Sequence, residues 1–128
     1  WNIAAGVVTG LLAAAAGLRD WIAIPGGTRA KAIGALHGLG NLIVVVLFAA
    51  SWWMRKDSAD YVPDTLAFFL SLVAFAIAGF TGWLGGELVY RLGVAVDDGA
   101  NINAPSSLSK KPVTSLDVVP ETEPGARR

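Results

Sequence analysis

The residue with the clearest potential for chemistry is His37, the only histidine in this chain of 128 residues. Asn41 follows four positions later, so both side chains would lie on one face of a helix. Gly34 and Gly38 share that face. His37 and Asn41 lie in a long segment without charge, residues 32–54, which could cross a membrane. Because polar side chains are costly in contact with lipid, this face must be turned toward protein or toward a cofactor.

Three interpretations of His37 are open at this point. The first is a structural hydrogen bond between His37 and Asn41 at a crossing of two helices. The second makes His37 a cofactor-binding residue, the axial ligand of a haem or chlorin, because imidazole is a common ligand of such a metal. The third is a proton relay, which would need further titratable groups in the apolar segments, and the sequence has none there. We favour the structural role.

The remaining residues form no recognisable catalytic or metal-binding set. A single histidine cannot supply a convincing Ser–His–Asp arrangement, and no glycine loop is followed by Lys and Ser or Thr for phosphate binding. The chain has no cysteine, which excludes disulfides, iron–sulfur clusters and thiolate zinc sites. The carboxylates of Asp57, Asp60 and Asp64 lack the glycine-centred loop of a calcium site. The net charge of zero gives no basic field for nucleic acid. We therefore expect no enzyme activity, no metal site and no resident cofactor.

Three long segments without charge must position these residues: 1–18, 32–54 and 65–86. A bilayer core requires roughly 20 apolar residues, and a single segment can cross it only as a helix. We predict an all-α membrane protein, an antiparallel helical bundle with spans at about residues 1–18, 32–54 and 65–92. These spans form a domain of residues 1–96, followed by an extended polar tail of residues 97–128.

The aromatic residues support this assignment. The phenylalanines lie inside the apolar segments, whereas tryptophan and tyrosine lie near their ends, at Trp1, Trp21, Trp52, Trp53, Tyr61, Trp83 and Tyr90. Amphipathic rings prefer the headgroup layer, where the ring is buried and its N–H or O–H remains hydrated.

Local signals place the helix ends. We expect the first helix to end near Leu18, where charged residues follow, and the second to end at Met54. Asp64 or Thr65 should cap the third helix, which continues beyond Gly86 and ends at Gly93. In that last part Glu87 and Arg91 are four residues apart and should meet on one helix face.

Glycines spaced four apart occur in each predicted span. Because lipid offers no hydrophobic drive between helices, we expect such pairs to line close helix contacts. The pairs are Gly6 with Gly10, Gly34 with Gly38, and Gly82 with Gly86.

The tail and the basic residues bear on topology. Residues 97–128 contain Pro105, Pro112, Pro120 and Pro124, which forbid a continuous helix, and we expect this tail to become ordered on a partner. More basic residues flank one side of the spans than the other, four (Arg19, Arg29, Lys31, Arg91) against two (Arg55, Lys56). The positive-inside rule then places the tail in the cytoplasm.

Trp1 is not an initiator methionine, so we expect that the sequence begins after processing or lacks part of its natural N-terminus.

Three stretches of the chain resemble a bacterial membrane family, domain of unknown function 2231. The first comprises residues 17–21 (GLRDW), 24–25 (IP) and 28–30 (TRA), and the second is His37 with Asn41. The third is residues 82–91, GWLGGELVYR, running into residues 93–96, GVAV. The resemblance implies a membrane protein of four helices, whose first helix begins near a His-Pro pair and is absent from this sequence. The family often has histidine at the position of Leu92 and glycine at that of Ala95. The lack of a second histidine weakens a cofactor site built within this chain alone.

These observations predict a non-catalytic subunit of a larger membrane complex, such as a redox or energy-converting complex, in which the chain acts as a structural scaffold. Its expected partners are membrane lipid and other subunits, contacted through glycine-lined helix faces and the tail, with no nucleic acid. The resemblance implies the bacterial cytoplasmic (inner) membrane. The alternative is a b-type cytochrome-like electron-transfer protein that binds a tetrapyrrole, haem or chlorin, at His37.

Overall fold

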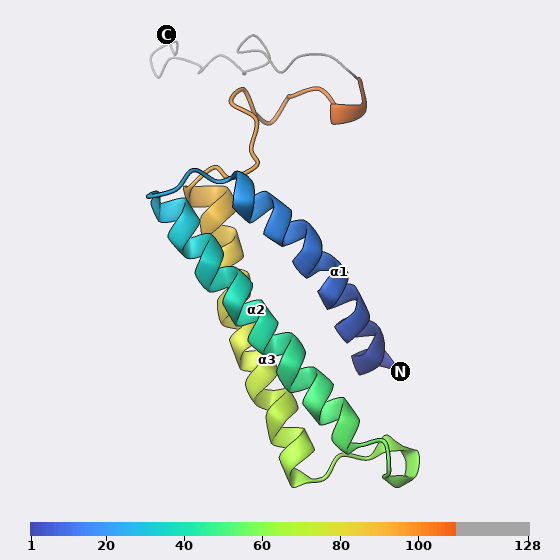
Figure 1. Cartoon of the computed structure of the whole chain (residues 1–128). Helices are drawn as coiled ribbons and strands as arrows, with labels where there is room; N and C mark the ends of the chain where they lie inside the picture. Colours follow the sequence, from blue (N-terminus) through green and yellow to red (C-terminus); the bar gives the residue numbers. More distant parts are fainter. Residues whose placement is uncertain (110–128) are drawn as a thin grey trace, which may run out of the picture. The chain divides into compact units, whose positions relative to one another are not determined.

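The computed structural model describes residues 1–109 of the chain. The chain divides into two compact units, Trp1–Val94 and Ala95–Arg128. The first unit contains all the long helices (Figure 1). In the second unit the described residues, 95–109, form turns and the short 3₁₀ helix η3, Ser107–Ser109. The later part of the predicted tail, residues 110–128, lies outside the described residues.

Three long α-helices make up the first unit: α1 (Asn2–Ala23), α2 (Arg29–Met54) and α3 (Thr65–Gly86). A 3₁₀ turn, η1 (Ala59–Tyr61), lies between α2 and α3, and a π-helical segment, η2 (Glu87–Arg91), continues α3. Each long helix is long and apolar enough to cross a membrane. The prediction of an all-helical protein with three transmembrane helices is therefore confirmed.

Helix α2 is the centre of the arrangement. Successive helices run antiparallel, as their short connections require (Figure 1). Helix α2 packs against α1 on one side and more extensively against α3, whereas α1 and α3 make no close backbone contact with each other within the described residues. The bundle is thus an open row in which α2 is shared, and α1 depends on α2 alone.

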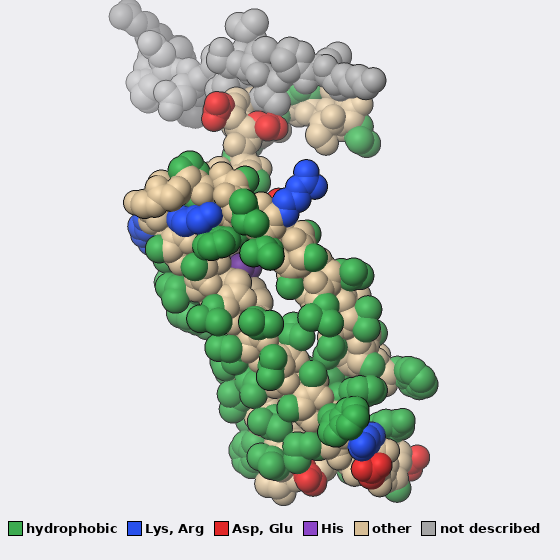
Figure 2. All heavy atoms as spheres, viewed as in Figure 1, with side chains coloured by type: hydrophobic (Ala, Val, Ile, Leu, Met, Phe, Trp, Pro, Cys, Tyr) green, Lys and Arg blue, Asp and Glu red, His purple; other side chains and the backbone are tan. Residues whose placement is uncertain are grey.

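The interior and exterior of this unit are the reverse of those of a soluble protein. The buried side chains are few and mostly small or polar: Val44, Ser51, Ala67, Ala74, Thr81 and Leu84. Large apolar side chains such as Phe68, Phe75 and Phe80 are exposed. Figure 2 shows hydrophobic side chains along the helices, with charged side chains gathered toward their two ends. This pattern suits lipid as the surrounding medium, because burial of apolar groups between helices gains little there.

The first helix does not end near Leu18 as expected, but continues to Ala23. The reason is a contact with the start of α2. The Trp21 indole Nε1–H donates to the Lys31 carbonyl at 3.0 Å, and the Lys31 ammonium donates to the Trp21 carbonyl at 2.6 Å. The ammonium also lies 3.9 Å from the centre of the Trp21 ring. These contacts hold the last turn of α1 in helical form although Arg19 and Asp20 have already left the apolar segment.

The connection that follows is set by its own residues. Ile24 precedes Pro25 and is extended (φ −69°, ψ 131°), because the proline ring disfavours helical backbone before it. Gly27 then turns the chain at a positive φ of 74°. The Thr28 hydroxyl accepts from the Lys31 backbone N–H at 3.1 Å and so caps α2.

Both ends of the third helix agree with the prediction. The Asp64 carboxylate accepts from the Ala67 backbone N–H at 2.7 Å, which is the expected N-terminal cap. At the other end Gly93 has a positive φ of 63°, and the Val94 N–H donates to the Leu88 carbonyl at 2.9 Å. Glycine tolerates this left-handed conformation without a Cβ clash, so the helix ends there.

Of the six glycines in the predicted pairs, two line a contact between helices of this chain. A Cβ built on Gly10 would meet Val45 at 3.0 Å, and one on Gly34 would meet Trp21 at 2.8 Å, so these two do line a helix contact. Three others, Gly6, Gly38 and Gly82, have nothing within 4 Å of such a Cβ, and Gly86 meets only Tyr90 of its own segment. The tight α2–α3 contact instead uses Gly40 and Gly85, which spacing alone did not single out. Glycines four residues apart mark one face of a helix, but their spacing does not show whether another helix of the chain packs against that face.

We predict that Gly40→Ala destabilises the protein. The new methyl group would clash with Thr81 Cγ2, and Thr81 is only 1% exposed, so it cannot move aside. Overpacking costs about 1–3 kcal/mol, which outweighs the gain of up to about 1 kcal/mol in helix propensity. The measurement is the midpoint of thermal unfolding in detergent.

Gly38→Ala is the matched control in the same helix. A Cβ at Gly38 meets nothing within 4 Å. The midpoint should therefore stay unchanged or rise for this variant. Equal midpoints for the two variants would contradict the assigned contact.

Candidate functional site

His37 lies in α2 on the side that faces α3. Its Nδ1 is 2.8 Å from the backbone carbonyl oxygen of Thr81. A carbonyl oxygen only accepts hydrogen bonds, so Nδ1 carries the proton and donates it. His37 is half-buried rather than enclosed.

Asn41 and Thr81 close a network around the ring. The Asn41 amide Nδ2–H donates to His37 Nε2 at 3.1 Å, and the Thr81 hydroxyl donates to Asn41 Oδ1 at 2.9 Å. The Thr81 hydroxyl also lies 3.0 Å from the Ala78 carbonyl, within its own helix. Every nitrogen of the His37 ring therefore has a partner, and three polar side chains satisfy one another between two helices.

Glycines let the two helices come close enough for this network. A Cβ on Gly85 would lie 3.1 Å from Cε1 of the His37 ring, and one on Gly40 would overlap the Thr81 methyl group. Side chains at either position would push α2 and α3 apart. The pairing of His37 with Asn41 follows from their spacing, whereas the contribution of Thr81 could be recognised only as a hydroxyl in an apolar segment.

The fit of a tetrapyrrole to His37 can be judged from the same geometry. A donor bond from Nδ1–H to a carbonyl is an arrangement that metal-binding histidines commonly have. Nε2, the atom that would bind the metal, instead accepts from Asn41 at 3.1 Å. No group of three or more His, Cys, Asp or Glu residues in the described part of the chain could hold a metal ion. The arrangement around His37 therefore does not fit an axial ligand unless the Asn41 side chain turns away.

A second polar network joins α2 and α3 nearer the other end of the helices. Ser51 is fully buried, and its hydroxyl donates to the Ala67 carbonyl at 2.6 Å. The Ser71 hydroxyl lies 2.7 Å from the Ser51 oxygen. The Arg55 Nη2 group donates to Ser51 Oγ at 3.1 Å and to Ser71 Oγ at 3.0 Å. This network was not predicted from the sequence, although Ser51 and Ser71 are hydroxyl residues within predicted spans.

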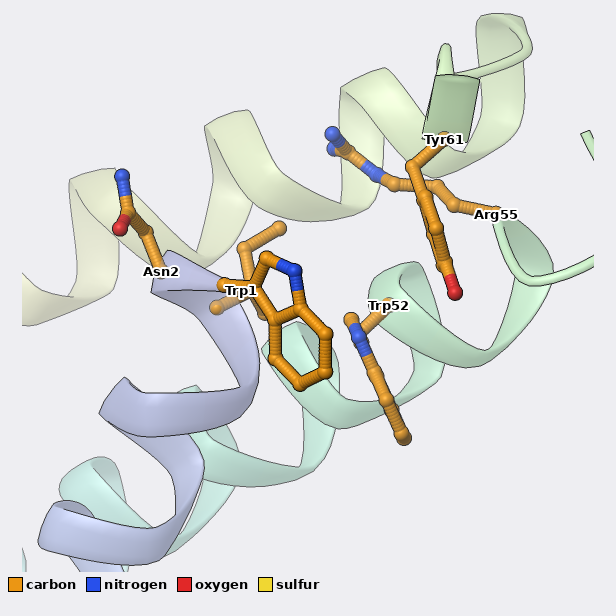
Figure 3. A pocket seen from close by; sticks show the side chains of 6 residues that line it. Trp1, Asn2, Trp52, Arg55 and Tyr61 are labelled. Carbon is orange, nitrogen blue, oxygen red and sulfur yellow. The ribbon is translucent and has the colours of Figure 1, made fainter. Parts of the chain in front are cut away.

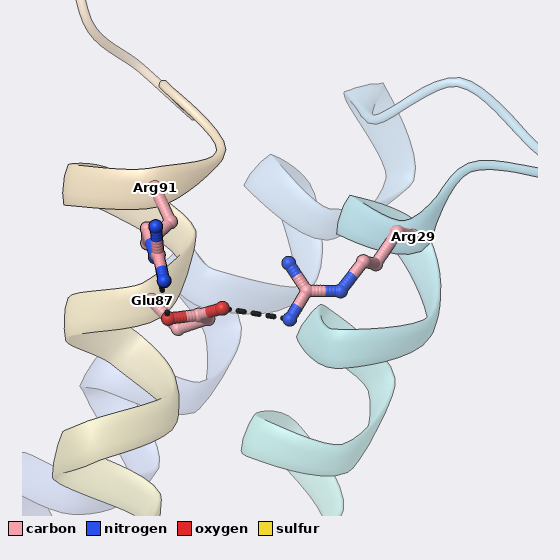
Figure 4. Close-up of polar contacts among 3 residues, drawn as sticks. All are labelled: Arg29, Glu87 and Arg91. Atoms are coloured by element: carbon pink, nitrogen blue, oxygen red, sulfur yellow. Dashed lines mark hydrogen bonds and ion pairs between the residues drawn. The ribbon is translucent and has the colours of Figure 1, made fainter.

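Charged residues meet at the end of α3 (Figure 4). The Glu87 carboxylate pairs with Arg91 at 3.9 Å, as its spacing predicted, and with Arg29 of α2 at 2.6 Å. The side chains of Arg29 and Arg91 are largely exposed, at 61% and 77%. Exposed ion pairs contribute little to stability, so this cluster mainly orients the end of α3 against the start of α2.

The fold and these networks define an integral membrane protein with three apolar helices, whose polar side chains inside the spans bind one another. The chain belongs to the family of predicted membrane proteins DUF2231, whose family model matches residues 1–98. This match confirms the resemblance noted from the sequence. No curated protein and no solved structure matches the chain. Ala95, where the family often has glycine, adopts a positive φ of 61°, a conformation that favours glycine.

We predict that Thr81→Val weakens the contact between α2 and α3. Valine keeps the shape of threonine but removes the hydroxyl that donates to Asn41 Oδ1. Hydrogen bonds between membrane helices contribute about 0.6–2 kcal/mol, so the unfolding free energy in detergent should fall by that order.

Thr9→Val is the matched control, because within residues 1–109 the Thr9 hydroxyl bonds to the carbonyls of Ala5 and Gly6 in its own helix and to no other helix. It should leave the unfolding free energy nearly unchanged. A loss as large as that of Thr81→Val would show that hydroxyl removal, rather than the link between helices, is being measured.

Proposed function

We propose that this chain is a non-catalytic subunit of a larger membrane complex, in which its helices act as a scaffold for other subunits. The observation that carries the proposal is the set of glycines that face away from the chain's own helices. Gly38 on α2, and Gly79 and Gly82 on α3, would have open space around an added Cβ. Small residues are enriched where one membrane helix approaches another, because they allow close contact between backbones.

The polar residues inside the spans support a non-catalytic role. His37, Asn41 and Thr81 bind one another, and Ser51 and Ser71 bind each other and Arg55. A catalytic base or acid needs a group that can reach a substrate. In these networks the hydrogen-bonding groups are directed to neighbouring helices, so we infer a structural role for them and no enzyme activity.

Copurification tests the proposal. In Gly82→Leu a bulky side chain would fill the open space on α3, which should release partner subunits while the isolated protein keeps its thermal stability. Val73→Leu, an exposed apolar change on the same helix, is the control and should retain the partners. Mild purification of both variants, followed by identification of the copurified subunits, is the measurement. Retention of every subunit by Gly82→Leu would argue against this face as the contact.

The tail is proposed as a second contact, an arm that becomes ordered on a partner. Deletion of residues 97–128 should leave membrane insertion intact, because the spans carry their own hydrophobic signal. The same purification would reveal whether association weakens.

A tetrapyrrole-binding electron carrier is the second candidate, favoured by the Nδ1–H···O=C bond that orients the His37 ring. The visible spectrum of the purified assembly distinguishes the electron carrier from the scaffold subunit. If His37 were an axial ligand, a haem or chlorin absorbance would be present and His37→Ala would abolish it. The scaffold proposal expects His37→Asn to lower thermal stability without changing any absorbance.

We further propose an orientation in the bacterial cytoplasmic membrane. Arg29 and Arg91 meet at one end of the bundle through Glu87, and the positive-inside rule favours this end as cytoplasmic, together with the tail. The loop of residues 55–64 would then face outward.

Single-cysteine labelling tests this orientation, since the chain has no native cysteine. A membrane-impermeant reagent applied from outside intact cells should label a cysteine at Ser58 and not one at Ser107. The opposite pattern would reverse the topology.

A further inference from the structure

Arg55, at the end of α2, holds a positive charge without a counter-charge. Its Nη2 group donates to two neutral hydroxyls, those of Ser51 and Ser71. Within residues 1–109 no carboxylate lies within ion-pair distance of it. Its Nε–H is buried and has no hydrogen-bond partner among those residues. An ionised group in such surroundings usually pairs with another charge.

The direction of the side chain makes this more unusual. Arginine near the end of a membrane helix commonly extends outward, toward water. Arg55 instead turns back along α2 to Ser51, one turn earlier, and across to Ser71 within α3. The Ser51 hydrogen is already donated to the Ala67 carbonyl, so the serine oxygens serve as acceptors that hold the guanidinium in this position.

A pocket of about 480 Å³ lies beside this group. Its lining comes from the start of α1, the end of α2 and η1, and comprises Trp1, Asn2, Ile3, Trp52, Arg55 and Tyr61. Figure 3 shows the rings of Trp1, Trp52 and Tyr61 gathered around one space, with the Arg55 side chain passing beside them. Tryptophan and tyrosine rings of this kind occupy the headgroup layer of a bilayer.

We propose that this pocket binds the phosphodiester group of a membrane phospholipid. Phosphate oxygens are strong hydrogen-bond acceptors, and their negative charge would balance the positive charge of Arg55. Guanidinium groups bind phosphate through paired N–H donors. Arg55 is one of the residues that line the pocket, and Tyr61 beside it is 56% exposed. The indole and phenol groups then contact the glycerol region, and the acyl chains extend along the apolar faces of α1 and α2.

The charges around the pocket favour a lipid over a free anion. The segment of residues 55–64 has two basic side chains, Arg55 and Lys56, and three carboxylates, Asp57, Asp60 and Asp64. It therefore has no positive field that would attract soluble phosphate. A phospholipid is held in the same layer as the pocket by the bilayer itself, so its effective concentration is high without such a field.

The test uses the full chain in a maltoside detergent and compares four additives. These are phosphatidylglycerol, phosphatidylethanolamine, the phosphate-free lipid digalactosyldiacylglycerol, and inorganic phosphate. Both phospholipids should raise the midpoint of thermal unfolding by roughly 2–5 °C. The glycolipid and inorganic phosphate should leave it unchanged. A rise with the glycolipid would indicate general lipid solvation, and a rise with inorganic phosphate would indicate a free-anion site; either would overturn the proposal.

Variants of the chain locate the effect. Arg55→Gln should abolish the rise, whereas Lys56→Gln, the neighbouring cation that lies over Trp53 and does not line the pocket, should retain it. Because Arg55→Gln also disturbs Ser51 and Ser71, Tyr61→Ala provides a second variant outside that network. Native mass spectrometry should show fewer retained phospholipids for Tyr61→Ala than for the unmodified chain. Equal retention would contradict the proposed pocket, as would an unchanged rise in Arg55→Gln.

Discussion

The contact between α2 and α3 is the interaction on which the rest of the structure depends. In a bilayer the hydrophobic effect does not drive helices together, so they associate through close packing and hydrogen bonds. Gly40 and Gly85 provide the close approach, and Thr81 and the His37 ring fill the space that these glycines leave. The polar groups of both helices then have no water to bind and must pair with each other. Packing and hydrogen bonding at this contact therefore require each other.

Two polar networks along this contact also set its register. The link from His37 and Asn41 to Thr81 lies toward one end, and the link between Ser51 and Ser71 toward the other. Sliding or rotating α3 against α2 would break both networks at once and leave polar groups unsatisfied in the bilayer. Helix α1 has no buried residue, and residues 11–20 within it are all exposed. Its polar link to α2 lies at the end of the helix, between Trp21 and Lys31. Its position is set at Gly10, near the middle of the helix, which meets Val45, and at Trp21, in its last turn, which packs on Gly34.

Features that depend on nearby residues could be predicted from the sequence. The three spans, the Asp64 cap and the end of α3 at Gly93 follow from hydrophobicity, capping and backbone preferences within a few residues. The end of α1 could not, because Trp21 is held by Lys31 after an intervening turn. The same holds for the glycines: their spacing defines a face, but which glycine touches a neighbour depends on how the helices are rotated.

For the candidate site, the sequence alone determined that His37 and Asn41 share one helix face and that this face must avoid lipid. Helical periodicity and the cost of polar groups in a bilayer are sufficient for that conclusion. Only the tertiary structure decided that Thr81 completes the network, that the Asn41 amide donates to His37 Nε2, and that Arg55 turns inward beside a pocket. These contacts join residues of separate helices, and their partners depend on the rotation and register of α2 against its neighbours. Helical periodicity carries no information about those quantities.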